Sequence, residues 1–206
     1  MPLPRPARRW VALAALVATA AMGACGEGRS GGPRGEPEVV VRSSPDRTFA
    51  ATAVSLDASA ADAQSTARVV LVDPPTALEV RGPGPAADYP ELADPLALVD
   101  MVRGAVAVEP YGGQAIRSVS SFRYELVVNV DRALAASPSH RRDEVAALAG
   151  RMGRPSFYAD VWVDGDGRLR RIQVPVDKAT KRPGNRDRNT PAVVTVDLFD
   201  YEAPET

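Results

Sequence analysis

The chain has 206 residues, a formal net charge of −1 and a single histidine. This length suits one domain with a tether and is long enough to bury a core. A near-neutral chain lacks the basic surface typical of nucleic-acid binding, so the composition excludes a nucleic-acid partner.

The first 24 residues have the layout of a secretory signal peptide. An arginine-bearing start, MPLPRPARR, precedes an apolar run that begins at Trp10 and ends in small residues. The run is shorter than the roughly 20 apolar residues that a transmembrane helix needs, and its small-residue end favours cleavage over anchoring. We therefore predict a signal peptide over residues 1–24 and an extracytoplasmic location for the rest.

Cys25 is the only cysteine and stands at the predicted cleavage point. A lone cysteine in an exported protein forms no internal disulfide, so it is free or modified. The sequence Met22-Gly23-Ala24-Cys25 resembles the bacterial lipobox, in which the cysteine is acylated, for example with palmitate, and becomes the mature N-terminus. Two or more acyl chains would hold the protein on the cell membrane. The alternatives are an ordinary signal peptide with an incidental cysteine and an uncleaved anchor.

Residues 25–38 are predicted to be a lipidated N-terminus and a disordered tether, because they are rich in Gly, Arg, Glu and Pro and have no apolar face. Residues 39–206 are predicted to form a single domain. At its start Val39–Val41 favour an extended chain, and a short helix is predicted over Pro45–Ala51 with Pro45 at its first position. Three short strands and a loop follow: Ala53–Leu56, Ala67–Val72, Thr76–Arg81 and the loop Gly82–Ala93.

Asp94 begins the clearest helix of the sequence. Its side chain can cap the helix, Pro95 suits the first helical position and Gly104 suits the C-terminal cap. An apolar stripe follows the helical period at Leu96, Val99 and Met101 or Val102. Beyond this helix we predict strands at Ala105–Glu109 and Gln114–Val119, with a turn at Pro110–Gly113 between them.

Phe122–Val130 has the strongest strand pattern, because alternate residues are almost purely apolar. That apolar face consists of Phe122, Tyr124, Leu126, Val128 and Val130. It is expected to be core first of all, although a lipid-lined hollow would use the same residue types.

A second helix is predicted after Ser137 or Ser139 and ends at Gly153. Its apolar residues lie at i, i+3, i+4 and i+7: Val145, Leu148, Ala149 and Met152. Next, strands over Phe157–Val163 and Arg168–Val176 flank an Asp-Gly-Asp-Gly turn. A charged loop over Asp177–Thr190 and a last strand over Ala192–Tyr201 complete an α+β domain.

Catalytic motifs are missing from the sequence. The lone His140 stands in a Ser-His-Arg-Arg helix start, where a solvated side chain is expected, and it cannot support a triad or a metal cluster. Asp164 and Asp166 suggest a calcium loop, but its twelfth position is Pro175 instead of Glu, so a hairpin turn is favoured. Asp160 and Asp164 lie on one face of the same strand. They could act as paired carboxylates, but we expect them to be polar residues of an exposed face. We predict no enzyme, no cofactor and no metal.

Two basic segments, Arg141-Arg142 and Lys178–Arg188, have two interpretations. They are a solvated helix start and a loop, or they contact anionic lipid headgroups, since the tether keeps the domain near a membrane.

Four segments together resemble the actinobacterial LppX/LprG-type lipoproteins, which share the LolA-like fold: DPLALVDMVRGA, SFRYELVVNVDRAL, DVWVDGDGRLRRIQVPV and VVTVDLFDYEAP. The resemblance covers about Asp94–Pro204. It implies a curved antiparallel half-barrel with short helices on its concave face and acyl chains between the two layers. The N-terminal half is shorter than in that family, which implies a shorter sheet and a smaller hollow.

The resemblance implies a membrane-anchored extracytoplasmic lipoprotein that binds lipid or acylated glycolipid and either holds or transfers it. The alternative is an envelope sensor or interaction module of the same fold, with a packed interior and a protein partner. Nine apolar residues are the candidates for lipid contact: Leu96, Val99, Val102, Tyr124, Leu126, Val128, Val145, Leu148 and Met152.

Overall fold

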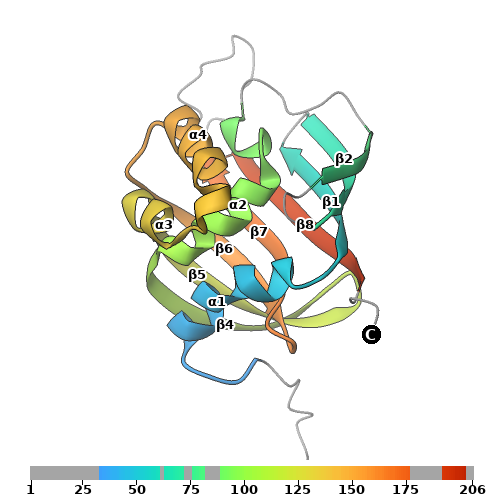
Figure 1. Cartoon of the computed structure of the whole chain (residues 1–206). Coiled ribbons are helices and arrows are strands. Elements are labelled where there is room, and N and C mark those ends of the chain that lie inside the picture. The colour runs from blue at the N-terminus through green and yellow to red at the C-terminus, as the bar shows by residue number, and fades with distance from the viewer. Residues whose placement is uncertain (1–32, 61–62, 72–75, 82–88, 177–191, 203–206) are drawn as a thin grey trace, which may run out of the picture.

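Figure 1 shows a computed structural model of the chain. It describes residues 33–60, 63–71, 76–81, 89–176 and 192–202. The predicted signal peptide, Cys25 and the charged loop Asp177–Thr190 lie outside the described residues, as do most of the tether and the predicted connection Asp73-Pro74-Pro75.

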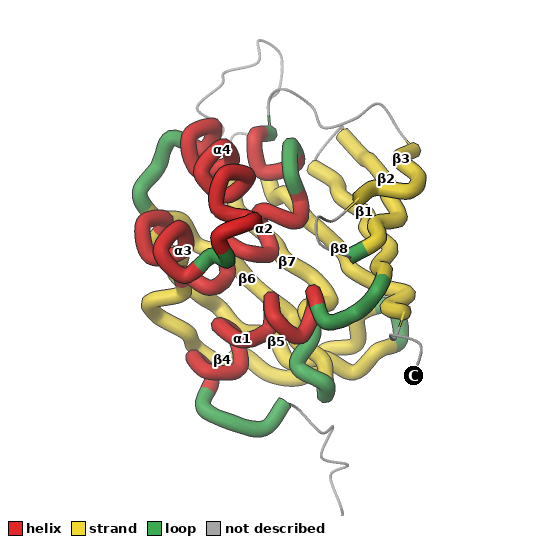
Figure 2. Tube along the Cα trace, in the orientation of Figure 1, coloured by secondary structure: helices red, strands yellow, loops and turns green. Residues whose placement is uncertain are grey.

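Eight strands form one sheet in the order β3-β2-β1-β8-β7-β6-β5-β4, and every neighbouring pair is antiparallel. The sheet curves into a half-barrel, and the helices lie on its concave side (Figures 1 and 2). The predicted α+β half-barrel is therefore confirmed. The strands are β1 Ala53–Ala60, β2 Ala63–Val70, β3 Thr76–Arg81, β4 Ala105–Ile116, β5 Val119–Asn129, β6 Ser156–Asp164, β7 Leu169–Val176 and β8 Ala192–Glu202.

Four α-helices and three short 3₁₀ turns are described on the concave side. None of the helices within residues 33–202 combines the length and the apolarity of a membrane span, as far as the chain is described. The helices are α1 Pro37–Phe49, α2 Pro95–Met101, α3 Val130–Ala136 and α4 Arg142–Met152, and the 3₁₀ turns are η1 Pro90–Leu92, η2 Val102–Gly104 and η3 Ser139–Arg141.

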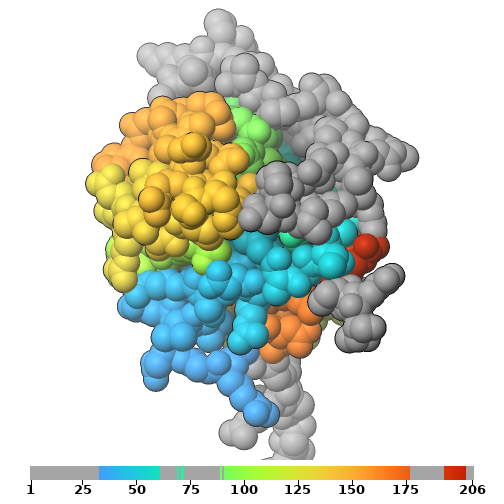
Figure 3. Space-filling view, in the orientation of Figure 1, coloured from blue at the N-terminus to red at the C-terminus, as the bar shows by residue number. Residues whose placement is uncertain are grey.

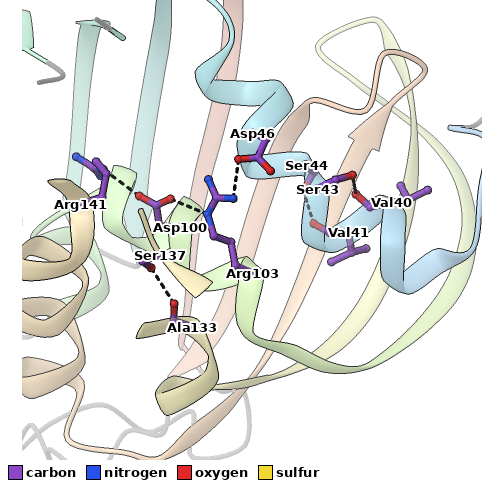
Figure 4. Close-up of polar contacts among 10 residues, drawn as sticks. All are labelled: Val40, Val41, Ser43, Ser44, Asp46, Asp100, Arg103, Ala133, Ser137 and Arg141. Carbon is purple, nitrogen blue, oxygen red and sulfur yellow. Dashed lines mark hydrogen bonds and ion pairs between the residues drawn. The ribbon is translucent and has the colours of Figure 1, made fainter. Parts of the chain in front are cut away.

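Helix α1 corrects the prediction for residues 37–51. It begins at Pro37, within the predicted tether, and runs through the valines that favoured extension. Val40 and Val41 are buried against the core, so tertiary packing outweighs their strand propensity. Pro45 lies inside the helix and lacks the N–H that would reach the Val41 carbonyl, and the Ser44 hydroxyl donates to that carbonyl instead, at 2.7 Å (Figure 4).

The β4–β5 hairpin also differs from the prediction. The predicted turn at Pro110–Gly113 lies inside β4, where the pairing with β5 shifts register between Pro110 and Gly112. Proline is tolerated there because β4 is the last strand of the sheet and pairs on one side only. The true turn falls at Arg117 and Ser118, inside the strand predicted over Gln114–Val119.

Two other predictions fell short. Strand β1 continues past its predicted end to Ala60, and β2 begins before its predicted start, at Ala63. This added stretch is rich in alanine and is held in the sheet by backbone pairing, for example of Asp57 with Thr66. Helix α3 was not predicted, and Val130, assigned to a strand, is its first residue. Asn129 gave the available signal, since its side chain caps α3 by accepting from the Arg132 N–H at 2.8 Å.

The remaining elements follow the prediction closely. The Asp94 side chain caps α2 by accepting from the Ala97 N–H at 2.9 Å. Gly153 ends α4 in the left-handed region, with φ of 63°. The β6–β7 hairpin turns at the predicted Asp-Gly-Asp-Gly sequence, and β8 matches the predicted last strand to within one residue.

Gly104 yields a stability prediction. A methyl group on it would lie 2.4 Å from the Asn129 carbonyl oxygen and 2.7 Å from the Ala133 nitrogen, because η2 passes directly against α3. Gly104→Ala should lower the free energy of unfolding by about 1–3 kcal/mol through overpacking. Gly150→Ala is the matched control, since that position in α4 has no described atom within 4 Å and should gain about 0.5–1 kcal/mol.

Urea unfolding followed by the fluorescence of Trp162, the one tryptophan after the predicted signal peptide, measures both changes. Equal effects of the two substitutions would contradict the close approach of η2 and α3.

Candidate functional site

The nine predicted lipid-contact residues meet between the sheet and its helices, in a layer that we call the interlayer. All nine belong to one apolar cluster, in which eight are buried and Met152 is half-buried. Helices α1, α3 and α4 cover this side of the molecule in Figure 3. The residues come from α2 and η2 (Leu96, Val99, Val102), β5 (Tyr124, Leu126, Val128) and α4 (Val145, Leu148, Met152).

The interlayer is filled by side chains around four of these residues. Val99, Val128, Val145 and Leu148 each have 0% exposure. A side chain with no exposure borders no space large enough for water, so these four residues contact protein atoms on all sides. In this structure they pack together instead of lining an open hollow.

The concave face extends well beyond β5. Strand β6 continues it because Val161 pairs with Tyr124 and Ala159 pairs with Leu126. Burial raises the pKa of the Tyr124 phenol, which stays neutral and behaves as part of the apolar layer. Strands β7 and β8 add five further buried residues that were not predicted as site residues: Ile172, Val174, Val194, Val196 and Leu198.

A buried ionic group, which we call the Asp100 cluster, joins the helices (Figure 4). Asp100 has 0% exposure. One of its carboxylate oxygens accepts from Arg141 Nε at 2.9 Å and the other accepts from Arg103 Nε at 3.1 Å. Arg103 also donates to Asp46 of α1 at 2.7 Å. The cluster of Asp46, Asp100, Arg103 and Arg141 thus connects α1, α2, η2 and η3.

The sequence prediction for Arg141 is wrong. Arg141 is buried, whereas the prediction was a side chain that is solvated or contacts lipid headgroups. Its guanidinium lies 5.4 Å from the centre of the Phe49 ring. Among the described residues its Nη2 has no hydrogen-bond partner. Arg142 is exposed, as expected, whereas Lys178–Arg188 lies outside the described residues.

The acidic candidates have structural partners. Asp164 accepts from the backbone N–H groups of Asp166 and Arg168 at 3.0 and 2.9 Å, which confirms the hairpin-turn interpretation. Asp160 pairs with Arg123 at 3.0 Å, as a polar residue of this face. The expectation of an exposed position is wrong for Asp164, which is buried and pairs with Arg170 at 2.6 Å. His140 is exposed, as predicted. Within the described ranges no three His, Cys, Asp or Glu side chains gather as a metal site.

These observations define an α+β protein in which helices cover the concave side of a curved antiparallel sheet. Known protein-family models and curated protein sequences give no match to the chain. Among solved structures, LprF from Mycobacterium bovis aligns over 84% of this chain and 96% of its own, with a TM-score of 0.51 and 12% identity.

Two further structures align with lower scores. Lipoprotein LppX from Mycobacterium tuberculosis covers 82% of this chain and 96% of its own at a TM-score of 0.45 and 11% identity. A LolA superfamily protein from Nitrosomonas europaea covers 84% of this chain and 96% of its own, at a TM-score of 0.26 and 8% identity. The likeness to LprF concerns the fold, and it confirms for the fold the resemblance to LppX/LprG-type lipoproteins predicted from the sequence.

The Asp100 cluster yields a second stability prediction. Asp100→Ala should lower the free energy of unfolding by about 3–5 kcal/mol, because it leaves two buried arginines without their shared carboxylate. The control is Glu38→Ala, which removes an exposed i,i+4 pair with Arg42 and should cost about 0.3–0.5 kcal/mol. Urea unfolding measures both, and a loss below about 1 kcal/mol for Asp100→Ala would contradict the structural role of the cluster.

Proposed function

We propose that the chain is an extracytoplasmic lipoprotein, anchored to the cell membrane through acylated Cys25, that binds lipid or acylated glycolipid in the interlayer. The observation that carries this proposal is the continuous apolar interlayer between a curved sheet and short helices that cover it. Binding would bury acyl chains and would involve no chemical step. Transfer of the bound lipid to another carrier or membrane is the further activity that the family resemblance suggests.

Lipid binding would require the helical cover to move, because the interlayer is filled in this structure. Helix α1 is tied to the sheet by hydrogen bonds, from the Leu169 N–H to Thr48 Oγ1 at 3.0 Å and from Arg42 Nε to the Ala105 carbonyl at 2.8 Å. Helices α2 and α4 face the interlayer with apolar side chains such as Val99 and Leu148. We therefore propose that α2 and α4 move and that α1 remains in place.

The hydrophobic cost of such movement is limited. Side chains that separate from one another would contact the acyl chain instead of water, and each buried methylene of the lipid would contribute about 0.8 kcal/mol. The exchange replaces one apolar contact by another.

The second candidate function is an envelope interaction module that binds a protein partner and no lipid. The 0% exposure of Val99, Val128, Val145 and Leu148 favours it, because a closed core needs no ligand for its stability. The two functions differ in whether the interlayer ever opens.

Native mass spectrometry of the protein purified from its own host tests lipid binding. We expect a non-covalent lipid in addition to the acyl chains on Cys25. Leu148→Phe, which adds volume on the buried face of α4, should lower the fraction of lipid-bound protein. Ala147→Phe adds a ring on the exposed face of the same helix and should leave that fraction unchanged.

Protein without lipid in the wild type and in both variants would contradict lipid binding and favour the interaction module. Equal lipid occupancy in Leu148→Phe and the wild type would place the lipid outside the interlayer.

The proposed anchor has its own test. Cys25→Ser removes the thiol that would be acylated, so we expect the protein to leave the sedimenting membrane fraction of its host. The wild-type protein should remain in the membrane fraction after a high-salt wash, because acyl chains are held by hydrophobic burial and not by charge. Retention of the serine variant in the membrane would contradict acylation as the anchor.

A further inference from the structure

A pocket of about 400 Å³ lies at the end of β8, at the edge of the interlayer, with which it shares Leu198. Its walls are the β4–β5 turn from Ile116 to Val119, Arg168 and Arg170 at the start of β7, and Leu198–Tyr201 of β8. None of the nine candidate lipid-contact residues lines it. Three chain segments that are distant in sequence thus build a second concave site.

Three arginines line this pocket, and they differ in how well they are paired. Arg117 forms ion pairs with Asp57 and Asp197. Arg170 Nε pairs with the buried Asp164 at 2.6 Å. Among the described residues, the one ion pair of Arg168 is a 3.9 Å contact with the exposed carboxylate of Asp166. Arg168 therefore retains most of its capacity to bind an anion.

The aromatic residues of the pocket hold these guanidinium groups in place. Arg168 and Arg170 lie 5.5 and 4.7 Å from the centre of the Tyr201 ring, and Arg117 lies 3.8 Å from the centre of the Phe199 ring. A guanidinium stacked on a ring keeps its N–H groups in the plane, directed away from the ring. Burial raises the pKa of Tyr201, so its phenol stays neutral and adds no negative charge to the site.

Positive φ angles mark the backbone around the pocket. The non-glycine residues with positive φ in the described chain are Arg117 at 46°, Ser118 at 68° and Asp200 at 51°. Arg117 and Asp200 line the pocket, and Ser118 lies in the turn that forms one wall. Arg117 and Ser118 are the two central residues of the β4–β5 hairpin, a turn that requires positive φ at both positions, so their conformation follows from the hairpin and shapes one wall of the pocket. Asp200 lies outside such a turn, and its conformation costs about 1–3 kcal/mol.

The pocket also lies toward the proposed anchor. In Figure 1 the described chain begins, at residue 33, at the same end of the domain as the β6–β7 turn that precedes Arg168. Seven residues lie between Cys25 and residue 33, so the two positions are at most about 28 Å apart when the chain is fully extended. An anchor at Cys25 would therefore keep this end of the domain close to the membrane surface.

We propose that this pocket binds a phosphate group, with Arg168 as the main donor and Arg117 beside it. The phosphate belongs either to the headgroup of an anionic phospholipid or to free inorganic phosphate. The orientation toward the membrane rests on the proposed anchor, whereas the pocket itself does not. A site of this kind would hold the β4–β5 turn and the start of β7 against the bilayer.

The test uses the chain from Gly26 to Thr206, which contains every described element and lacks the proposed anchor. Binding to vesicles is measured by flotation, with phosphatidylcholine alone and with added phosphatidylglycerol. Arg168→Gln should weaken binding to the anionic vesicles about fivefold, the effect of one basic residue at such a surface. The control Arg151→Gln removes the same charge from an exposed position at the end of α4 and should bind like the wild type.

In a second arm, inorganic phosphate is titrated while the arginine Nε–H resonances are followed by nuclear magnetic resonance. A headgroup site predicts selective loss of vesicle binding in Arg168→Gln. A free-phosphate site predicts a saturating shift of the Arg168 resonance with no difference on vesicles. Equal behaviour of the two variants on vesicles, without a phosphate-dependent shift at Arg168, would overturn the proposal. Because the anchor is absent, failure of the proposed acylation would not affect either result.

Discussion

The helical layer depends on the buried carboxylate of Asp100, whose charge must be balanced by neighbouring arginines. A carboxylate with 0% exposure needs charged partners at close range, and it finds them in Arg103 and Arg141. These residues come from α2, η2 and η3, and Asp46 adds α1 through Arg103. The helices are therefore held to one another by charge, whereas the interlayer beneath them is held by apolar contact. Movement of α2 and α4 over a stationary α1 would break the pair between Arg103 and the exposed Asp46, which costs little, and would keep the buried Arg103–Asp100–Arg141 contacts together.

The two faces of the sheet are stabilised in different ways. The concave face is apolar and packs under the helices. The convex face pairs Arg123 with Asp160, and Arg123 and Arg171 lie 5.5 and 5.8 Å from the Trp162 ring centre. Trp162 is consequently buried under these side chains, on a face that none of the described helices covers. The convex face is thus covered by its own charged side chains, whereas the concave face is covered by the helices.

The sequence predicted what depends on short-range pattern. Alternation over Phe122–Val128 identified the concave face of β5, and Asp94 with Pro95 identified the start of α2. It failed where distant contacts decide, as in α1, whose valines are helical because they pack on the core. It also failed for Arg141, whose partner Asp100 is 41 residues away, because spacing carries no information about such a pair. The pocket at the end of β8 combines three distant segments, so it could not be predicted from the sequence for the same reason.

Hydrogen exchange tests the central claim, that α2 and α4 form a movable cover over a lipid-binding interlayer. The protein purified from its host would be compared before and after removal of bound lipid. Our account predicts that amide exchange changes in α2 and α4, while the amides of β5–β8 and α1 exchange at the same rates in both forms. Identical exchange throughout α2 and α4, with lipid shown to be bound in one sample, would contradict it.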